Sequence, residues 1–245
     1  MTQGTYLHLE HDGKLLLVDS EGKGPQIPIK GRINSNGEQG WLFRFPTHTE
    51  VDSMGIKWTM KDKFVLDIGE SKTTILKGQP EIPWPEKWAW KDDVISDSCV
   101  HPAVRESVYR SIHRLVSKVV IQDQNKQVLL AKVKRGHFVG CWTLPGGYLD
   151  HNEHPRIGAA RETMEELGIH VEINVNNTSI VSQNIFTEEG ISFVSFTYLV
   201  NINSDKIKFN LKSDEIEEVK WFERNDAIKS ASSWFDIQAI QELTE

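Results

Sequence analysis

Three glutamates in the second half of the chain have the types and spacing to do chemistry together. Glu162, Glu165 and Glu166 are spaced i, i+3 and i+4 within 155–167, a stretch with a strong helical pattern. On a helix this spacing places the carboxylates on one face, where like charges repel by roughly a few tenths of a kcal/mol per pair. A hard divalent cation removes that repulsion, and Mg²⁺ binds through a few carboxylates together with substrate phosphates. The simpler interpretation is a solvated helix face, which the glutamates alone would favour.

The residues around the glutamates overturn the simpler interpretation. From Gly147 to Ile169 the chain follows the pattern G-x5-E-x7-R-E-U-x-E-E-x-G-U, in which U is aliphatic. Every fixed position is filled, by Gly147, Glu153, Arg161, Glu162, Glu165, Glu166 and Gly168. Thr163 departs from the pattern at the first U position, but it keeps a β-branched shape and removes no ligand. The stretch resembles the signature of the Nudix hydrolases, and flanking sequence extends the resemblance over about residues 117–245.

The resemblance implies a loop-helix-loop site with defined roles for these side chains. Glu162, Glu165 and Glu166 would bind the catalytic cations, Mg²⁺ or alternatively Mn²⁺, directly or through water, and Glu153 would assist them. Arg161 would orient the carboxylates by bidentate hydrogen bonds, for which its planar fork is suited. Gly147 and Gly168 would allow the sharp entry into the helix and exit from it.

Some candidates lie outside the helix. Glu215, six residues before Trp221, stands where some Nudix proteins place an additional metal-binding glutamate, although solvated turn glutamates are common. Arg135 closes a strand rich in basic residues and is our candidate for gripping a substrate phosphate, with a solvated strand end as an equal alternative. Gly146 and Gly147 are expected to contact the substrate.

The chemistry that the resemblance implies is hydrolysis of a pyrophosphate linkage. Cations neutralise the phosphate oxygens and lower the pKa of a bound water, which attacks one phosphorus. A carboxylate takes the proton, and the sequence leaves two groups of candidates open. They are Glu165 and Glu166 on the helix, and Glu188, Glu189 and Glu215 on loops.

The rest of the chain divides into three predicted parts. Residues 1–78 show short strands and turn signals, including Asp12-Gly13, and no convincing helical period occurs before residue 100. Residues 79–100, rich in Trp and Pro, are interpreted as a linker. Residues 101–245 begin with an amphipathic helix that extends to about Val116 and continue as strands and helices. We therefore predict an α/β protein, a C-terminal Nudix α/β/α sandwich with a smaller, mainly β N-terminal domain.

The linker tryptophans have two interpretations. Trp84, Trp88 and Trp90 could form a stacking surface for a base, but aromatic residues near a linker more often seal an interface between domains. We favour packing. The N-terminal domain itself is expected to widen the substrate pocket, to form a homodimer interface or to bind a partner.

Composition excludes several function classes. The 245 residues carry 28 basic and 35 acidic side chains, and the net charge of -7 argues against a nucleic-acid partner. The chain shows neither a signal peptide nor an apolar run of the roughly 18 residues that a membrane helix needs. Cys99 and Cys141 are too few for a disulfide framework, so we expect a cytoplasmic protein with reduced thiols and no membrane partner.

The substrate is narrowed only to a nucleotide-type small molecule. The resemblance implies a nucleoside diphosphate joined to another group: a dinucleotide such as NADH, a nucleotide sugar or a nucleoside triphosphate. NADH pyrophosphatases carry the sequence SQPWPFPxS after the signature, and here only its first two residues agree, as Ser182-Gln183. The proline that ADP-ribose hydrolases usually show after the signature is missing, and so is the tyrosine of dinucleoside polyphosphate hydrolases. The alternative is a non-catalytic, nucleotide-sensing Nudix protein that acts on a partner through its N-terminal domain, but such proteins often lose signature glutamates, and all are present here.

Overall fold

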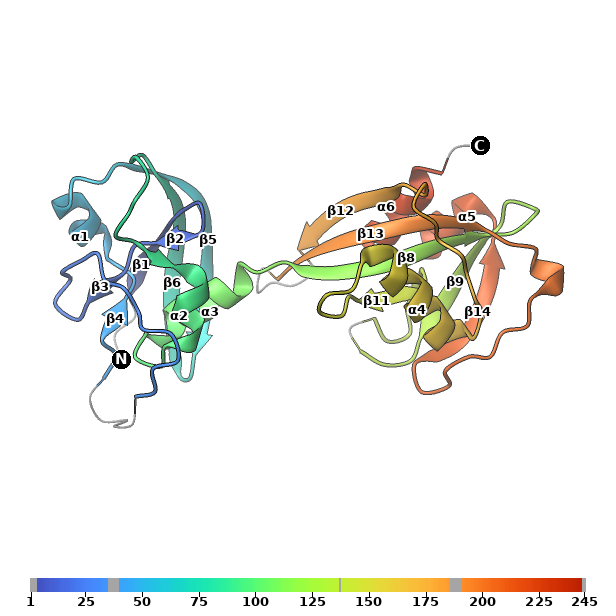
Figure 1. Ribbon diagram of the computed structural model, residues 1–245, viewed down its shortest axis with the longest axis horizontal. Helices are drawn as coiled ribbons and strands as arrows, with labels where there is room; N and C mark the ends of the chain where they lie inside the picture. The colour runs from blue at the N-terminus through green and yellow to red at the C-terminus, as the bar shows by residue number, and fades with distance from the viewer. Residues whose placement is uncertain (1–3, 35–39, 137, 186–190, 244–245) are drawn as a thin grey trace. The chain divides into compact units, whose positions relative to one another are not determined.

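The chain folds as two compact units. The computed structural model describes residues 4–34, 40–136, 138–185 and 191–243, without the side chains of 183–185. The first unit includes Met1–Ile112, and the second is made of His113–Phe186 and Ser192–Glu245. Both are coloured by residue number in Figure 1.

The first unit is built on a five-stranded sheet of order β5-β6-β1-β2-β7. Its strands are β1 (Thr5–His11), β2 (Lys14–Leu15), β5 (Trp58–Ile68), β6 (Ser71–Pro80) and β7 (Ala89–Trp90). Asp12 and Gly13, at φ 47° and 82°, form the turn between β1 and β2, which confirms the predicted hairpin. A separate ribbon pairs β3 (Val18–Asp19) with β4 (Phe43–Arg44).

Two short helices lie before residue 100, where the sequence shows no convincing helical period. They are α1 (His48–Ser53) and α2 (Lys91–Ser96). Helix α1 starts with a capping box, in which Thr47 accepts from the Glu50 N–H and the Glu50 carboxylate accepts from the Thr47 N–H. That Thr-x-x-Glu signal is visible in the sequence, but a helix of six residues is too short to show a period.

The segment predicted as a linker, 79–100, is an integral part of the first unit. Strand β7 pairs with β2, and Trp88, Ala89, Val94 and Val100 are buried. Trp88 is 6% exposed, so one of the three tryptophans packs in the core of its own unit. The linker prediction was wrong because prolines interrupt the hydrogen-bond ladder only locally, and the chain resumes its sheet after them.

The other two tryptophans are half-exposed. Trp84 and Trp90 are 44% and 47% exposed, and the Lys14 ammonium lies 5.0 Å from the centre of each ring. The same ammonium donates to the carbonyls of Pro85 and Glu86 at 3.2 and 2.9 Å. These rings therefore hold a lysine of their own unit by cation–π contact.

Helix α3 (Pro102–Arg110) also belongs to the first unit, where the sequence placed it in the Nudix domain. Its Ala103, Val104 and Val108 pack in the cluster of Leu15 and Phe45. The predicted helix was also too long, since 114–116 already form part of β8. The apolar period showed which side of the helix is buried but not which sheet covers it, so the boundary moves from residue 101 to between 112 and 113.

The second unit contains a seven-stranded sheet of order β10-β9-β8-β13-β12, with β11 on β8 and β14 on β9. Its strands are β8 (Arg114–Gln122), β9 (Val128–Val133), β10 (Trp142–Thr143), β11 (Gly146–Tyr148), β12 (Ser179–Ile185), β13 (Ser192–Asn201) and β14 (Ile216–Phe222). Strands β8 and β13 run parallel, and the other pairs are antiparallel. Residues 170–175 form no strand.

Helices cover both faces of this sheet. Val119 and Ile121 of β8 pack with Ala159 of α4 (Pro155–Leu167), whereas Val120 packs with Ile240 of α6 (Trp234–Gln241). Because successive strand residues point to opposite faces, α4 and α6 lie on opposite sides of the sheet. Helix α5 (Arg224–Ser230) joins the α6 side, and a short 3₁₀ helix, Ser204–Lys206, follows β13. The α/β/α sandwich and the additional β-rich unit are confirmed.

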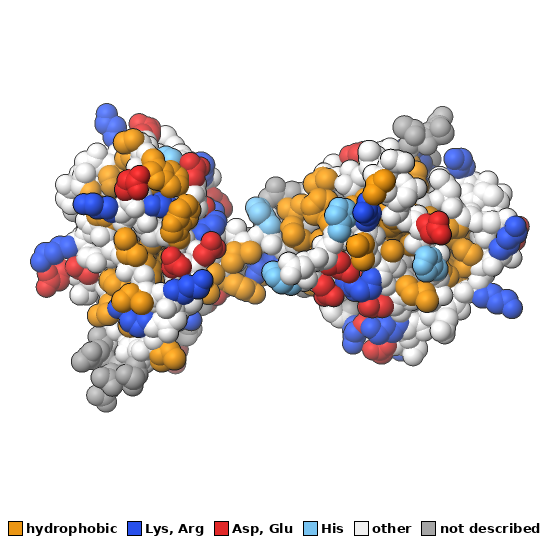
Figure 2. Space-filling view, viewed as in Figure 1, with side chains coloured by type: hydrophobic (Ala, Val, Ile, Leu, Met, Phe, Trp, Pro, Cys, Tyr) orange, Lys and Arg blue, Asp and Glu red, His pale blue; other side chains and the backbone are white. Residues whose placement is uncertain are grey.

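The surface carries charged side chains of both signs, as the composition of the chain predicts. On the face in Figure 2, acidic and basic side chains are interspersed over both units. Within the described residues, no helix is long and apolar enough to cross a membrane.

Candidate active site

Helix α4 carries the candidate residues and has well-defined ends. At its start, His154 accepts from the Arg156 N–H at 3.3 Å and Pro155 occupies the first turn. At its end, Gly168 adopts φ 67°, and a Cβ there would lie 2.7 Å from the Asn210 carbonyl oxygen. The predicted exit glycine is therefore required by both conformation and space.

Arg161 is the centre of the ionic network. Its Nε and Nη2 donate to the two carboxylate oxygens of Glu153 at 2.8 and 2.9 Å, a bidentate pair. Its Nη1 donates to Glu162 at 2.9 Å and, at 3.4 Å, to Glu165. Its Nη2 also donates to the carbonyl of Tyr148 at 3.0 Å. One guanidinium thus connects the loop before the helix with the carboxylates on it.

The two glycines of β11 bring the backbone against two of these carboxylates. The Gly146 N–H donates to Glu166 Oε2 at 3.0 Å. A Cβ on Gly147 would lie 2.7–2.8 Å from the atoms of the Glu162 carboxyl group, so a side chain at this position would displace that carboxylate. Gly146 has φ 140°, and a Cβ there would lie 2.2 Å from the Ser117 carbonyl oxygen. The sequence thus keeps side chains out of the space in front of the helix.

Burial and charge act differently on the carboxylates. Burial, reinforced by the charge of Glu162, raises the pKa of Glu166 to about 7, although the Gly146 N–H opposes the shift. Burial also raises the pKa of Glu162, against the effect of Arg161. Hydrogen bonds from Arg161 lower the pKa of Glu153. For Glu162 and Glu166 the effect of burial therefore outweighs that of their hydrogen-bond donors, whereas for Glu153 the hydrogen bonds from Arg161 outweigh burial.

Carboxylates of this kind fit a hard divalent cation in donor chemistry and in charge. Glu162, Glu165 and Glu166 come from one helix face, and the first and last have raised pKa values that a cation would lower. Across the described part of the chain, however, no three His, Cys, Asp or Glu side chains converge as a ready-made metal cluster. In this arrangement Arg161 holds Glu162. The side chain of Glu165 is 46% exposed, and its one contact within the described segments is the ion pair with Arg161 at 3.4 Å.

The two candidates outside the signature lie against each other. Arg135 forms an ion pair with Glu215 and another with Asp214 at 3.3 Å, and Lys212 Nζ reaches Glu215 at 2.8 Å. The Lys212 N–H also donates to the carbonyl of Glu166, which places this loop beside the end of α4. Glu188 and Glu189 lie outside the described residues, as do the side chains of residues 183–185.

Two residues that the sequence analysis missed support residues 144–147, the segment that we call the glycine turn. Lys118 of β8 and Asp236 of α6 form a buried ion pair, and Asp236 accepts from the Leu144 N–H. Burial raises the pKa of Asp236, against the effect of Lys118. An aspartate in the largely apolar stretch 234–240 was the available signal.

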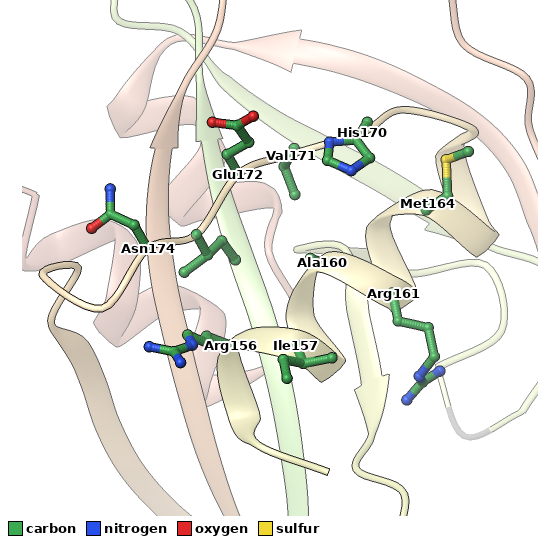
Figure 3. Close-up of a pocket in the computed structure, with 10 residues that line it drawn as sticks. Arg156, Ile157, Ala160, Arg161, Met164, His170, Val171, Glu172 and Asn174 are labelled. Atoms are coloured by element: carbon green, nitrogen blue, oxygen red, sulfur yellow. The ribbon is translucent and has the colours of Figure 1, made fainter.

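A shallow groove of about 570 Å³ runs along the outer side of α4 (Figure 3). Ile157 and Met164 line it from the helix, and His170 and Val171 line it from the following segment. At about 100° per residue, Ile157 and Met164 project from the side of the helix opposite to Glu166. Arg161 also lines the groove, so the groove adjoins the carboxylate network at this arginine while Glu166 faces the other side of the helix.

Comparison with known proteins identifies the family of the second unit. The family model for the NUDIX domain matches residues 112–243. The chain is 26% identical over 136 residues to Nudix hydrolase 19, chloroplastic, of Arabidopsis thaliana, covering 54% of this chain and 29% of that protein. It is also 26% identical over 129 residues to the ADP-ribose pyrophosphatase of Methanocaldococcus jannaschii, covering 53% and 72%.

Among solved structures, the MutT NUDIX hydrolase from Burkholderia pseudomallei is 28% identical, with a TM-score of 0.45, over 54% of this chain and 99% of that one. The match spans only 29% and 36% of the first two curated relatives, the second being a MutT-like protein of Streptomyces ambofaciens. The family model covers more than half of the chain, and the signature residues lie on the predicted loop-helix-loop. This chain belongs to the Nudix family.

Proposed function

We propose that this protein hydrolyses a pyrophosphate bond in a nucleoside diphosphate linked to another group, with Mg²⁺ as its cation. The observation that carries the proposal is the carboxylate face of α4, where one arginine, Arg161, is shared by Glu162 and Glu165 with Glu153, and where Glu166 accepts from the Gly146 N–H and has a pKa raised to about 7. Nudix hydrolases generally use divalent metal ions, and this carboxylate face has the oxygen donors that Mg²⁺ prefers.

Each signature side chain has a task in this proposal. Glu162, Glu165 and Glu166 would hold the cation, which when bound would lower the pKa of a water and neutralise phosphate oxygens. Arg161 keeps Glu162 and Glu153 in place by the hydrogen bonds described above. Glu153 thereby assists through the arginine.

The proton acceptor is proposed from the same contacts. Glu165 is the least engaged of the helix carboxylates among the described residues, with one contact at 3.4 Å, so it is free to accept a proton from the attacking water. Glu215 would first have to leave Arg135 and Lys212. We therefore assign the general base to Glu165 and keep Glu215 as a further cation ligand in the proposal.

Substrate contacts would come from the turn and the neighbouring loop. Gly146 and Gly147 carry no side chain, so a phosphate would be able to approach their backbone closely. Arg135 is 58% exposed and paired with the exposed Asp214, so a phosphate can compete for its guanidinium. The candidate substrates are NADH and other dinucleotides, nucleotide sugars and nucleoside triphosphates. ADP-ribose joins them because one relative is named as its pyrophosphatase.

Two attributes of the whole chain belong to the proposal. We assign the protein to the cytoplasm because Cys99 and Cys141 are free thiols. We assign the first unit to substrate selection or homodimer formation. Expression of 113–245 alone, compared with the full chain in substrate profile and mass, tests that assignment, and identical results would contradict it.

The test of the activity is a phosphate-release screen with excess Mg²⁺ and added alkaline phosphatase. The panel contains NADH, ADP-ribose, FAD, dinucleoside polyphosphates, nucleoside triphosphates and nucleotide sugars. Turnover of one class is expected, and Glu165→Gln and Glu166→Gln should each lower it by about 100-fold or more. Glu172→Gln, on the exposed segment after α4, is the matched control and should retain full turnover.

Two results would contradict the proposal. Full turnover in both Glu165→Gln and Glu166→Gln would remove the assigned site. Silence of the folded wild-type protein across the whole panel would instead support the nucleotide-sensing alternative.

A further inference from the structure

A buried ion pair lies on the face of the second sheet that α6 covers. Lys118 Nζ donates to Asp236 Oδ1 at 2.6 Å, and the two residues are 8% and 0% exposed. Asp236 sits on a helix whose Ala239 and Ile240 belong to an apolar cluster. A buried carboxylate is costly even when it is paired, and an apolar side chain would pack at this position without that cost. Packing alone therefore does not explain an acid here.

The second hydrogen bond of Asp236 leads to the glycine turn. Its Oδ2 accepts from the Leu144 N–H at 3.0 Å. In the next residue, the Pro145 carbonyl accepts from the backbone of β8 at 2.9 Å. In the residue after that, the Gly146 N–H donates to Glu166 Oε2 at 3.0 Å. Three consecutive residues are thus fastened to α6, to β8 and to α4 in turn.

We propose that Asp236 is a positioning residue for the active site, because through Leu144 it holds the Gly146 N–H on Glu166. Asp236 does not touch the carboxylates itself. The inference rests on the proposed function, since it gives Asp236 a role in turnover only if Glu166 takes part in hydrolysis.

The turn is well suited to transmit this restraint. Gly146 pairs with Lys118 in the β11–β8 ladder, so the backbone of Lys118 lies under the glycine while its ammonium holds Asp236. A Cβ on Gly146 would lie 2.2 Å from the Ser117 carbonyl oxygen, which shows how closely the turn lies on β8. A displacement of Leu144 is therefore passed to the neighbouring Gly146 rather than absorbed by loose packing.

The experiment compares two double variants of the full chain that differ only in the acceptor offered to Leu144. Lys118→Met with Asp236→Leu removes the ion pair and the acceptor. Lys118→Met with Asp236→Asn removes the ion pair but keeps a side-chain oxygen. Three quantities are measured: the thermal midpoint, kcat and KM on the substrate found in the screen, and hydrogen exchange of the Leu144 and Gly146 amides in the absence of metal and substrate.

The expected result separates positioning from stability. The leucine variant should keep its midpoint, since apolar side chains replace a buried ion pair at little cost. Its kcat should fall about 10- to 100-fold with KM unchanged, as for other supporting residues, and its Gly146 amide should exchange faster. The asparagine variant should recover most of the turnover and of the amide protection. Ile240→Val, which loosens the same apolar cluster without touching the turn, should leave kcat unchanged.

Several outcomes would overturn the inference. The first is a folded leucine variant with the kcat and the Gly146 amide exchange of the wild type. The second is an equal loss of kcat in the leucine and asparagine variants. The third is a loss of kcat in Ile240→Val as large as that in the leucine variant. If the leucine variant does not fold, Asp236→Ala in the Lys118→Met background replaces it. If the wild type hydrolyses nothing in the panel, the proposed function fails, while amide exchange at Gly146 still decides whether Asp236 holds the turn.

Discussion

The two units of this protein use arginine–carboxylate contacts in opposite ways. In the first unit, Arg44 and Arg32 each bind a single acid. Arg44 binds both oxygens of Glu50 at 2.8 and 2.6 Å, and Arg32 binds Asp97 through Nε and Nη2. The hydrogen bonds from Arg44 lower the pKa of Glu50 to about 2. Such pairs are complete, and they fasten loops and helix starts to the fold.

In the second unit one arginine is shared. Arg161 contacts Glu153, Glu162 and Glu165. Glu166, by contrast, accepts a hydrogen bond only from the Gly146 backbone N–H among the residues that the structure describes, and its pKa is raised to about 7. The surplus negative charge is concentrated on one helix face. The comparison shows that an acid with an arginine of its own stabilises the fold. Several acids that share one arginine keep an excess of negative charge, which a bound cation can neutralise.

The largest expected effect is a loss of turnover on substitution of Arg161 that substitution of Arg44 does not cause. Arg161→Lys loses the bidentate bonds to Glu153 and the link to Glu162, so turnover should fall by about 100-fold with little change in the thermal midpoint. Arg44→Lys, the matched control in the first unit, should lower the midpoint and leave kcat unchanged. Steady-state kinetics and thermal unfolding of both variants test this, and comparable losses of kcat in the two would remove the distinction.

The pH dependence of stability should have opposite signs in the two units, in metal-free buffer. The pKa of Glu50 is lowered, so its stabilising contribution is present above about pH 4.5 and is lost as the pH falls toward 2. The pKa of Glu166 is raised, so the contribution of this residue to the stability of the second unit is most favourable below about pH 4.5 and declines as the pH rises through 7. The decline is on the order of 3 kcal/mol.

Urea unfolding from pH 3 to 8 measures both units separately. The NMR signals of the buried Leu7 in the first unit and Val119 in the second report each one. Glu166→Gln should abolish the decline of the second unit and leave the first unchanged. A decline that survives in Glu166→Gln would show that the raised pKa of Glu166 is not its cause.

Adding Mg²⁺ should sharpen the comparison with a smaller effect. A cation that binds only the folded carboxylate face stabilises the second unit by about 1.4 kcal/mol at ten times its dissociation constant. The Val119 signal should then move to higher urea while the Leu7 signal stays in place, and chelation should reverse the change. Equal shifts of both signals would indicate a general salt effect.

The smallest expected effect concerns the departure from the family signature. Thr163 is buried, and its hydroxyl donates to the carbonyl of Ala159 at 2.8 Å, within its own helix. Thr163→Val removes that donor together with its need for a partner, so the free energy of unfolding should change by less than about 1 kcal/mol and kcat should not change. A large loss of turnover would mean that Thr163 has a role at the carboxylate face.

Local patterns predicted the parts of this fold that depend on few neighbours. The Asp12-Gly13 turn, helix α4 with Gly168 behind it and the three glutamates on one helix face follow from short-range spacing. The sequence could not assign α3 to its sheet or recognise 79–100 as part of the first unit, since both depend on contacts between distant segments. It likewise could not show that Arg135 and Glu215 would pair, because they are brought together by adjacent loops.

By itself, the sequence determined the family, the chemistry of the carboxylate face and the glycines that make room for it, because fixed spacing along one helix and turn has only one spatial meaning. Only the tertiary structure decided which of the carboxylates pair with Arg161 and which is buried away from it. Arg161 reaches Glu153 and Glu162, whereas Glu166 is buried under Gly146, and its pKa depends on burial that no local pattern contains. The same holds for Asp236, which meets Leu144 from 92 residues away along the chain because α6 packs on the sheet behind the turn.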